Sequence, residues 1–365
     1  MIDAPPPKRR RALIFGAATV ALASGVGLAA GETVMRALRG RIEGSDRLDR
    51  GLTAYDPELG WSLTPNWRGR HRHHDYDVGY ATNALAFRGP EEAAREPCAL
   101  WLGDSFTFGF GVDDGLTFVD RLDAARAGGL RHVNLGTPGY STDQEILLLE
   151  KRIAEFDARF IGLAAYLGND LIDNQLAFPL QAATAKPYFE LRQGALVRRN
   201  RPVPQAVKPA GERARGFGVR LFDMAGVAPG RLDGLVNAFE TPRWLGLERP
   251  APPADFERRA RPELVASLAL FTALIGRLRA AGKPAALVLL ASRRHLVAPE
   301  SWAGRYQEAL RAGLSRAPLG LPLLDLAEGF RGVAGADGLH HPNEGHLTQA
   351  GHAAVAERIV AARLP

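Results

Sequence analysis

Apolar residues predominate in five short runs over the C-terminal two thirds of the chain. These runs cover residues 99–102, 132–135, 160–167, 285–291 and 322–326. Runs of this length without polar alternation are typical of strands that are buried on both faces of a sheet. Between the runs, hydrophobic positions recur at helical spacing, most clearly over residues 143–156, 263–281, 306–314 and 351–363.

This alternation of strand and helix patterns predicts the fold class. It is typical of a parallel sheet covered by helices on both faces, so we expect a flavodoxin-like three-layer α/β/α sandwich with a mainly parallel five-stranded sheet. Ligands of such folds bind at the carboxyl ends of the strands. Residues 176–262, rich in Pro, Arg and Gly, interrupt the pattern, and we interpret them as a lid-like insertion in a domain over residues 97–365.

The N-terminus has the pattern of a targeting segment. A basic cluster at residues 8–11 precedes an uncharged run over residues 12–31, which is about long enough to span a bilayer as a helix. We interpret residues 1–35 as a cytoplasmic tail and a transmembrane signal-anchor. A signal peptide cleaved near residues 21–23 is the alternative. The first interpretation predicts a single-pass membrane protein whose remaining chain lies on the extracytoplasmic, periplasmic side, and the second predicts a secreted protein.

Residues 36–96 predict a linker followed by a small β-rich lead-in, with short alternating stretches between Pro and Gly residues. Three histidines of this lead-in, His71, His73 and His74, lie near Asp75 and Asp77. No second ligand group accompanies them at the spacing of a metal site, so we expect a solvated flank of a hairpin.

Composition excludes few functions. The net charge of +6 and the pI near 9.7 come from scattered arginines, and no nucleic-acid-binding motif accompanies them. We therefore expect no nucleic-acid partner. Cys98 is the only cysteine and lies in an apolar run, which indicates a buried strand residue. No motif points to a cofactor or a metal, and the oligomeric state stays open.

Polar residues with chemical potential follow three successive predicted strands. Residues 103–109 form the block Gly-Asp-Ser-Phe-Thr-Phe-Gly, which places the hydroxyl of Ser105 at a strand tip before a helix start. The second strand ends in a turn with two glycines around Pro138, and the third ends in Gly-Asn-Asp at residues 168–170. A hydroxyl, a free backbone N–H and a carboxamide at one sheet edge are what acyl transfer requires.

In order and spacing, these blocks resemble those of the SGNH/GDSL hydrolase family, from about residue 97 to the end of the chain. The segments at residues 55–61 and 83–89 also resemble those that precede the catalytic domain in a bacterial, N-terminally anchored branch of the family, although Ala86 stands where Gly is usual. The resemblance implies that Ser105 is the nucleophile. It also implies an oxyanion hole formed by the backbone N–H groups of Ser105 and Gly139 and by the side chain of Asn169.

The resemblance leaves two histidines as candidates for the catalytic base. His340 follows Asp337 in the usual Asp-x-x-His spacing, whereas His346 begins a His-Leu-Thr-x-x-Gly-His run that leads into the last helix. We prefer His346, with Glu344 or Asp337 as its acidic partner. We expect His341 and His352 to face solvent or cap a helix, and Asp104 and Asp170 to orient turns.

The resulting hypothesis is a serine esterase that hydrolyses acyl esters, with acetyl on a cell-envelope glycan as the favoured substrate, through an acyl-Ser105 intermediate. A polysaccharide O-acetyltransferase and a lysophospholipase-like lipid esterase use the same chemistry. A catalytically silent glycan-binding scaffold is the non-enzymatic alternative. The partners expected are thus an acylated glycan or a lipid ester, together with a membrane at the N-terminal helix.

Overall fold

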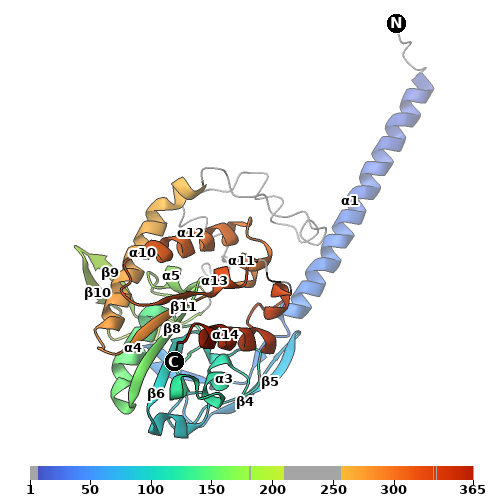
Figure 1. The fold of residues 1–365 in the computed structure, drawn as a ribbon. Helices are drawn as coiled ribbons and strands as arrows, with labels where there is room; N and C mark the ends of the chain where they lie inside the picture. The colour runs from blue at the N-terminus through green and yellow to red at the C-terminus, as the bar shows by residue number, and fades with distance from the viewer. Residues whose placement is uncertain (1–6, 181, 209–255, 332, 334, 365) are drawn as a thin grey trace. The chain divides into compact units, whose positions relative to one another are not determined.

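The structure is a computed structural model that describes residues 7–364 except 181, 209–255, 332 and 334. Of the described residues, those up to Ser45 belong to one compact unit and those from Asp46 onward belong to another. Helix α1 (Pro7–Glu43) makes up the described part of the first unit (Figure 1). The sheet, its helices and the lead-in belong to the second.

The second unit is built on one parallel sheet with the strand order β7-β6-β8-β11-β12. All neighbouring strands of this sheet are parallel. The first strand of this sheet in sequence, β6, thus lies between the second, β7, and the third, β8, which is the flavodoxin-like order, and the prediction is confirmed. The strands lie within two residues of the predicted runs, as β6 (Cys98–Gly103), β7 (Arg131–Asn134), β8 (Ala158–Tyr166), β11 (Ala285–Leu290) and β12 (Leu323–Asp325).

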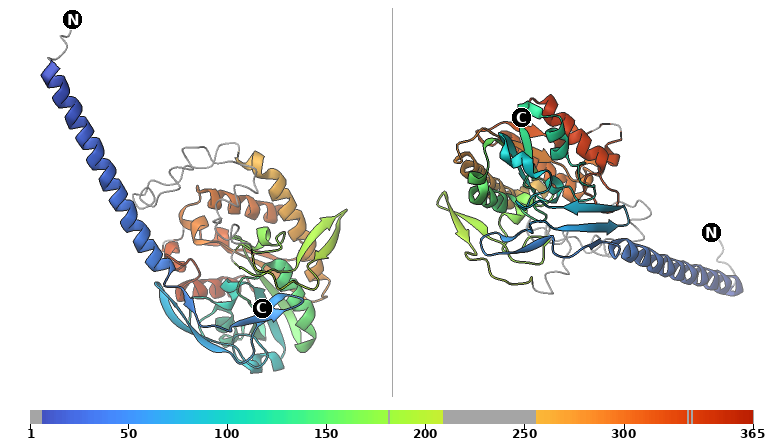
Figure 2. Two further views of the ribbon diagram at one scale, coloured as in Figure 1. Left: turned by 180° about the vertical axis from the view of Figure 1, so that it is seen from behind. Right: turned by 90° about the horizontal axis from the view of Figure 1, so that it is seen from below.

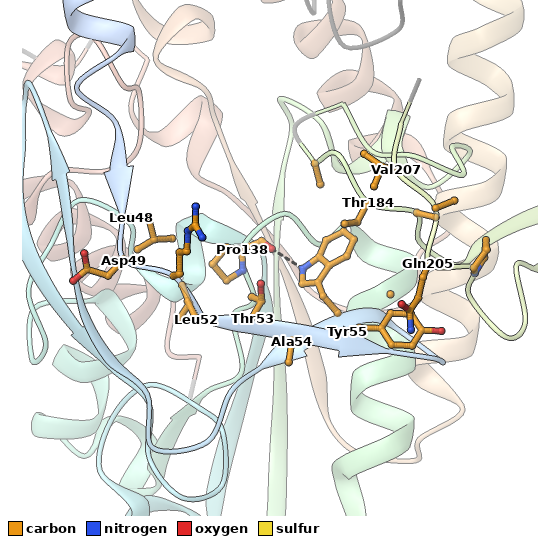
Figure 3. Close-up of a pocket in the computed structure, with 18 of the residues that line it drawn as sticks. Leu48, Asp49, Leu52, Thr53, Ala54, Tyr55, Pro138, Thr184, Gln205 and Val207 are labelled. Atoms are coloured by element: carbon orange, nitrogen blue, oxygen red, sulfur yellow. Dashed lines mark hydrogen bonds between the residues drawn. The ribbon is translucent and has the colours of Figure 1, made fainter. Parts of the chain in front are cut away.

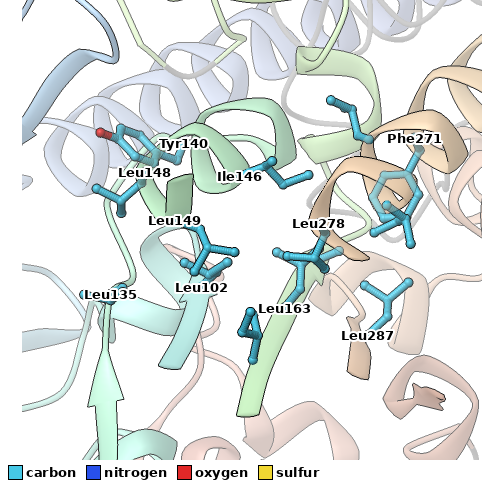
Figure 4. Packing of buried hydrophobic residues seen from close by; sticks show 14 of the residues in the cluster. Leu102, Leu135, Tyr140, Ile146, Leu148, Leu149, Leu163, Phe271, Leu278 and Leu287 are labelled. Carbon is cyan, nitrogen blue, oxygen red and sulfur yellow. The ribbon is translucent and has the colours of Figure 1, made fainter. Parts of the chain in front are cut away.

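Alternate residues of each strand enter two separate hydrophobic layers. In β6, Leu100 and Leu102 pack with one cluster, whereas Ala99 and Trp101 pack with the other. Figure 4 shows leucines of the strands facing those of the helices in the first cluster. The helices of that layer are α4 (Thr142–Arg152), α10 (Phe256–Arg279) and α12 (Trp302–Arg316), and those of the second are α3 (Phe118–Ala124) and α14 (Gln349–Ala361).

The remaining elements of the core are short. The pattern analysis did not predict α3, because its seven residues are too few to establish a helical period. The other short helices are α2 (Ser105–Phe108), α5 (Asp170–Asp173), α11 (Arg293–Val297), α13 (Leu326–Gly329), and the 3₁₀ turns η1 (Glu91–Arg95), η2 (Ala127–Gly129), η3 (Ile153–Glu155) and η4 (Ala336–Leu339).

The lead-in is β-rich, as predicted, and its strands lie against one side of the core (Figure 2). It contains a three-stranded antiparallel sheet of β1 (Arg47–Leu48), β4 (Arg68–His73) and β5 (Tyr76–Ala81). A hairpin of β2 (Thr53–Asp56) and β3 (Gly60–Leu63) accompanies that sheet.

The expectation of a solvated flank is wrong for His71. This residue is buried, and its ring nitrogens lie 2.9 Å from the Tyr80 hydroxyl and 2.7 Å from the Asp46 carboxylate. Tyr80 and Tyr76 pack their rings against the imidazole, so burial follows from the aromatic neighbours on β5. Among the described residues, no group of His, Cys, Asp or Glu has the arrangement of a metal site.

The insertion is described at its two ends. At its start, a hairpin of β9 (Tyr188–Arg192) and β10 (Ala195–Arg199) precedes the undescribed residues, and α10 begins after them. Lys186, just before β9, is buried and forms an ion pair with buried Asp143 at the start of α4. The lid-like part of the prediction at residues 209–255 lies outside the described residues.

Helix α1 extends past the predicted end of the apolar run. The linker expected after residue 36 begins as a continuation of α1, which runs to Glu43. The sequence there lacks proline, and Glu32 and Arg36 form an ion pair at the favourable i,i+4 spacing. Within the described chain, the stretch Ala18–Ile42 is the one helix long and apolar enough to cross a membrane.

Candidate active site

Ser105 is the first residue of helix α2, one residue after the end of the inner strand β6. Asp104 caps this helix, and its carboxylate accepts a hydrogen bond from the backbone N–H of Phe106 at 2.8 Å. The strand end must be Gly103, because a Cβ there would lie 2.0 Å from the Thr107 hydroxyl. The close approach of strand and helix thereby fixes where the Ser105 hydroxyl is presented.

A hydrogen-bonded chain joins Ser105 to the C-terminal loop. The Ser105 Oγ lies 2.6 Å from Nε2 of His346. The other ring nitrogen, Nδ1, bonds to the carboxylate of Glu344, whose second oxygen accepts from the His346 backbone N–H at 2.9 Å. A hydroxyl, an imidazole and a carboxylate thus lie in series, which is the arrangement of a triad.

The electrostatics of this chain suit a general base. Burial lowers the pKa of His346, but the adjacent Glu344 carboxylate outweighs that effect, and the pKa rises above its ordinary value. Burial raises the pKa of Glu344, yet attraction to His346 and hydrogen bonds from it bring that pKa down to about 2. Glu344 is therefore ionised at neutral pH, so Nδ1 carries the proton it donates and Nε2 is free to accept from Ser105.

His340 lies elsewhere and has a different partner. It is 2% exposed, and its Nε2 lies 3.1 Å from the carbonyl oxygen of Ala291, to which it donates. Burial lowers its pKa to about 4. A neutral imidazole that donates its proton to a backbone carbonyl stabilises the loop after β11, and it has no contact with Ser105.

Two backbone N–H groups and one side-chain amide follow the neighbouring strands β6, β7 and β8, at the carboxyl edge of the sheet. The turn after β7 is tied to β6 by a 2.9 Å bond from the Thr137 N–H to the Gly103 carbonyl. Among the described residues, the N–H groups of Ser105 and Gly139 donate to no acceptor. Asn169 is buried at the end of β8, and its amide donates one N–H to Asp173 at 3.1 Å, which leaves a second N–H.

The other candidate residues take structural roles or lie apart. Asp104 and Asp170 orient turns as expected, since each accepts a bond from a nearby backbone N–H. His352 is fully buried rather than solvent-facing, and it caps α3, as the other alternative predicted, because its Nδ1 accepts from the N–H of Phe118, the first residue of that helix, at 3.1 Å. His341 is half-buried against the Gly111 carbonyl. The side chain of Asp337, in η4, lies outside the described part.

The site is nearly closed. Ser105 is only 3% exposed, and Phe106 and Phe110 pack against the His346 ring with centroids 4.7 and 5.4 Å away. Both phenylalanines belong to the sequence just after the nucleophile. A hydrophobic enclosure of this kind excludes water and strengthens the hydrogen bonds inside it.

A cavity of about 570 Å³ lies beside the site, between the lead-in and the start of the insertion (Figure 3). Pro138, which precedes Gly139, and Phe110, which contacts His346, form part of its wall, although Ser105 and His346 do not line it. The wall mixes apolar and polar side chains, including Leu48, Asp49, Arg50, Leu52, Thr53, Tyr55, Trp61, Thr184, Gln205 and Val207.

The sequence analysis assigned no role to three lead-in residues that touch the site's loops. The Trp61 indole donates to the Pro138 carbonyl at 2.9 Å, and Asp75 accepts three hydrogen bonds from residues 343 and 344. Arg88 is buried and donates to the carbonyls of Phe108, Gly109 and Val112. Trp61 and Arg88 lie in the two lead-in segments, at residues 55–61 and 83–89, that resemble those of one branch of the family. That resemblance was the one sequence signal that could have linked these residues to the site.

No family model matches the chain, and no curated protein matches it. Solved structures do. A lipase/acylhydrolase from Enterococcus faecalis is 14% identical, at a TM-score of 0.35, over 73% of this chain and 94% of its own. A lipolytic protein of the G-D-S-L family from Desulfitobacterium hafniense is 12% identical, at a TM-score of 0.38, over 72% and 98%. A G-D-S-L lipolytic protein from Veillonella parvula is also 12% identical, at 0.36, over 72% and 96%.

What this chain itself presents is the order of strands, the glycine-lined serine turn and the loop histidine before the last helix. The resemblance to the SGNH/GDSL hydrolases predicted a flavodoxin-like sheet with these sequence blocks at its carboxyl edge, and the structure has both.

Proposed function

We propose that the protein is a serine esterase that works through an acyl-Ser105 intermediate. The observation that carries this proposal is the continuous hydrogen-bonded series from the Ser105 hydroxyl through His346 to Glu344. A serine hydroxyl is a weak nucleophile, and an adjacent base that is itself held by a carboxylate is what activates it.

The mechanism follows from these positions. Nε2 of His346 takes the hydroxyl proton as Ser105 Oγ attacks the ester carbonyl, and Glu344 stabilises the imidazolium that forms. The free N–H groups of Ser105 and Gly139 and the second N–H of Asn169 are the candidates to hold the oxyanion. His346 then returns the proton to the departing alcohol. Water, deprotonated by the same imidazole, attacks the acyl-enzyme and releases the carboxylic acid.

A small acyl group such as acetyl is the substrate part that the enclosure favours. Little of Ser105 is exposed, and the space beside Gly139 is narrow, because a Cβ there would lie 3.3 Å from the Trp61 ring and 3.9 Å from the Ala182 methyl. We propose that the neighbouring cavity receives the alcohol part of the ester. Its wall is mainly apolar, and it also carries the aromatic rings of Tyr55 and Trp61 and the polar side chains of Asp49, Arg50 and Gln205, a combination that can hold a sugar ring.

The location of the reaction is part of the same proposal. Helix α1 contains one apolar stretch of membrane-spanning length near the N-terminus, preceded by the basic cluster at residues 8–11. Basic residues stay on the cytoplasmic side, so the catalytic domain would lie on the other face of the membrane, where envelope glycans are found.

The test uses the full chain purified in mild detergent, with a nitrophenyl acetate as substrate. We expect turnover by the wild type and its loss in Ser105→Ala, by on the order of 10³-fold or more. Absence of turnover and of covalent labelling by a fluorophosphonate would contradict the enzyme proposal and favour a glycan-binding scaffold.

A second experiment separates hydrolysis from transfer. The same protein is incubated with an acetyl donor and an oligosaccharide, and the products are weighed by mass spectrometry. Hydrolysis predicts free acetate and an unchanged sugar, whereas acetylated sugar would make the protein an O-acetyltransferase.

A further inference from the structure

We propose that the lead-in is a working part of the active site, in which Trp61 orients the oxyanion peptide and Asp75 holds the turn that carries Glu344. Both are positioning residues, and neither touches the reacting atoms. The inference rests on the proposed function, because it concerns the geometry of the donor at Gly139 and of the acid Glu344.

The first contact acts through a single peptide unit. The Trp61 indole N–H donates to the carbonyl oxygen of Pro138 at 2.9 Å, the bond drawn as a dashed line in Figure 3. In a trans peptide the carbonyl and the next N–H point in opposite directions. An anchor on the Pro138 oxygen therefore fixes the direction of the Gly139 N–H.

Trp61 is itself held firmly enough to serve as an anchor. Tyr140, just after the turn, donates its hydroxyl to the Trp61 carbonyl, and the two rings meet edge to face with centroids 5.6 Å apart. The Gln144 amide donates to the Leu59 carbonyl at 2.8 Å. The hairpin and the turn are thus connected by hydrogen bonds in both directions, which restricts rotation of the peptide between Pro138 and Gly139.

The second contact holds the acid. One carboxylate oxygen of Asp75 accepts from the backbone N–H groups of Asn343 and Glu344, at 2.9 and 3.0 Å, and the other accepts from the Asn343 side chain at 2.6 Å. The Asp75 side chain is only 4% exposed. Burial raises its pKa, but the bonds from Asn343 and Glu344 outweigh burial and lower it. Asp75 is thus an ionised clamp at the start of the turn that ends in His346.

Positioning predicts effects on turnover that a general loss of stability does not. Trp61→Phe keeps an aromatic ring and removes only the donor. Loss of an oxyanion donor costs roughly 10²–10³ in rate. In Trp61→Phe the Gly139 N–H remains but its direction is no longer fixed, so kcat should fall about 10-fold, with KM nearly unchanged. The matched control is Trp101→Phe, which removes an equivalent 2.9 Å bond that an indole donates to Nδ1 of His132 in the core, rather than to a catalytic loop or to the wall of the cavity.

For Asp75, the alanine and asparagine variants are compared. Asp75→Ala removes the clamp, so we expect kcat to fall about 10-fold and the acid limb of its pH profile to move to lower pH, because Glu344 would no longer be held against His346. Asp75→Asn keeps an acceptor for the two backbone N–H groups and should restore most of the activity. Asp113→Ala is the control, since it removes a 2.7 Å bond to the Gly79 N–H elsewhere in the lead-in.

All variants are assayed as full chains with nitrophenyl acetate, and each thermal midpoint is measured. Supporting results are the kcat losses in Trp61→Phe and Asp75→Ala, with midpoints like those of their controls. If the wild type turns over substrate through Ser105 but Trp61→Phe and Asp75→Ala match the controls in kcat, the positioning roles are wrong and the esterase stands. If either variant fails to fold, the other decides. A wild type without Ser105-dependent turnover overturns both proposals.

Discussion

His340 and His346 lie six positions apart in one loop, and their surroundings give them opposite properties. His346 faces a carboxylate and the Ser105 hydroxyl, and its pKa is raised. His340 faces a backbone carbonyl in an enclosed position, and burial lowers its pKa to about 4. Both rings are buried, and the difference lies in the Glu344 carboxylate, which outweighs burial at His346, whereas the bond to the Ala291 carbonyl does not outweigh burial at His340.

The comparison teaches that spacing in a motif does not select the base. Asp337 and His340 have the spacing usual in the family, but Nε2 of His340 donates a hydrogen bond to the Ala291 carbonyl and not to a catalytic partner. Glu344 replaces the usual aspartate two residues before His346. Its longer side chain reaches both the ring and the backbone N–H of the same histidine.

The largest expected effect is that of His346→Ala. Removal of the base leaves Ser105 unactivated, so kcat/KM for nitrophenyl acetate should fall by about 10⁴-fold or more, as for other triad members. Ser105→Ala sets the floor for the measurement. If His346→Ala retained most of the activity, the distinction between the two histidines would be wrong.

The next effect is that of Glu344→Gln. The amide keeps the size but loses the charge, so we expect kcat to fall by roughly 10³–10⁴-fold. In the wild type, activity requires neutral His346, and its raised pKa places the acid limb of kcat/KM above the ordinary value of 6.5. Without the carboxylate, the two effects of Glu344 that raise this pKa are lost while burial still lowers it, so the limb moves to lower pH. A limb that does not move would mean that Glu344 does not set the pKa of His346.

The smallest effect on activity is expected for His340→Ala. This change leaves the buried Ala291 carbonyl without its donor, which typically costs about 1–3 kcal/mol of stability. Activity should stay close to that of the wild type at a temperature where the variant is folded. The midpoint of thermal unfolding and kcat are measured for each variant. His340→Gln can still donate to the Ala291 carbonyl, so it should recover part of the decrease in the midpoint.

The sheet was predictable because its signal is local. Most of the strands are apolar runs, and α4 and α12 show a helical period, so the layers and the strand order followed from short windows of sequence. The turn at Ser105 is equally local, since Gly103, Asp104 and the helix start are neighbours in the chain. The short helix α3 and the burial of His71 escaped because packing, rather than pattern, determines them.

The contacts of the lead-in with the site could not be predicted. Trp61 and Pro138 are 77 residues apart, and Asp75 and Asn343 are 268 apart. Nothing in either segment indicates its partner, since a single indole or carboxylate fits many environments. The choice of base had the same difficulty, because it depends on how the loop between residues 340 and 346 turns toward β6.

Covalent labelling of the full chain with a fluorophosphonate, followed by peptide mapping, tests the central claim most directly. The account predicts one adduct, on Ser105, formed rapidly by the wild type and His340→Gln and slowly by His346→Ala. An adduct on another residue, or ester turnover that persists with Ser105 unlabelled and replaced by alanine, would contradict it.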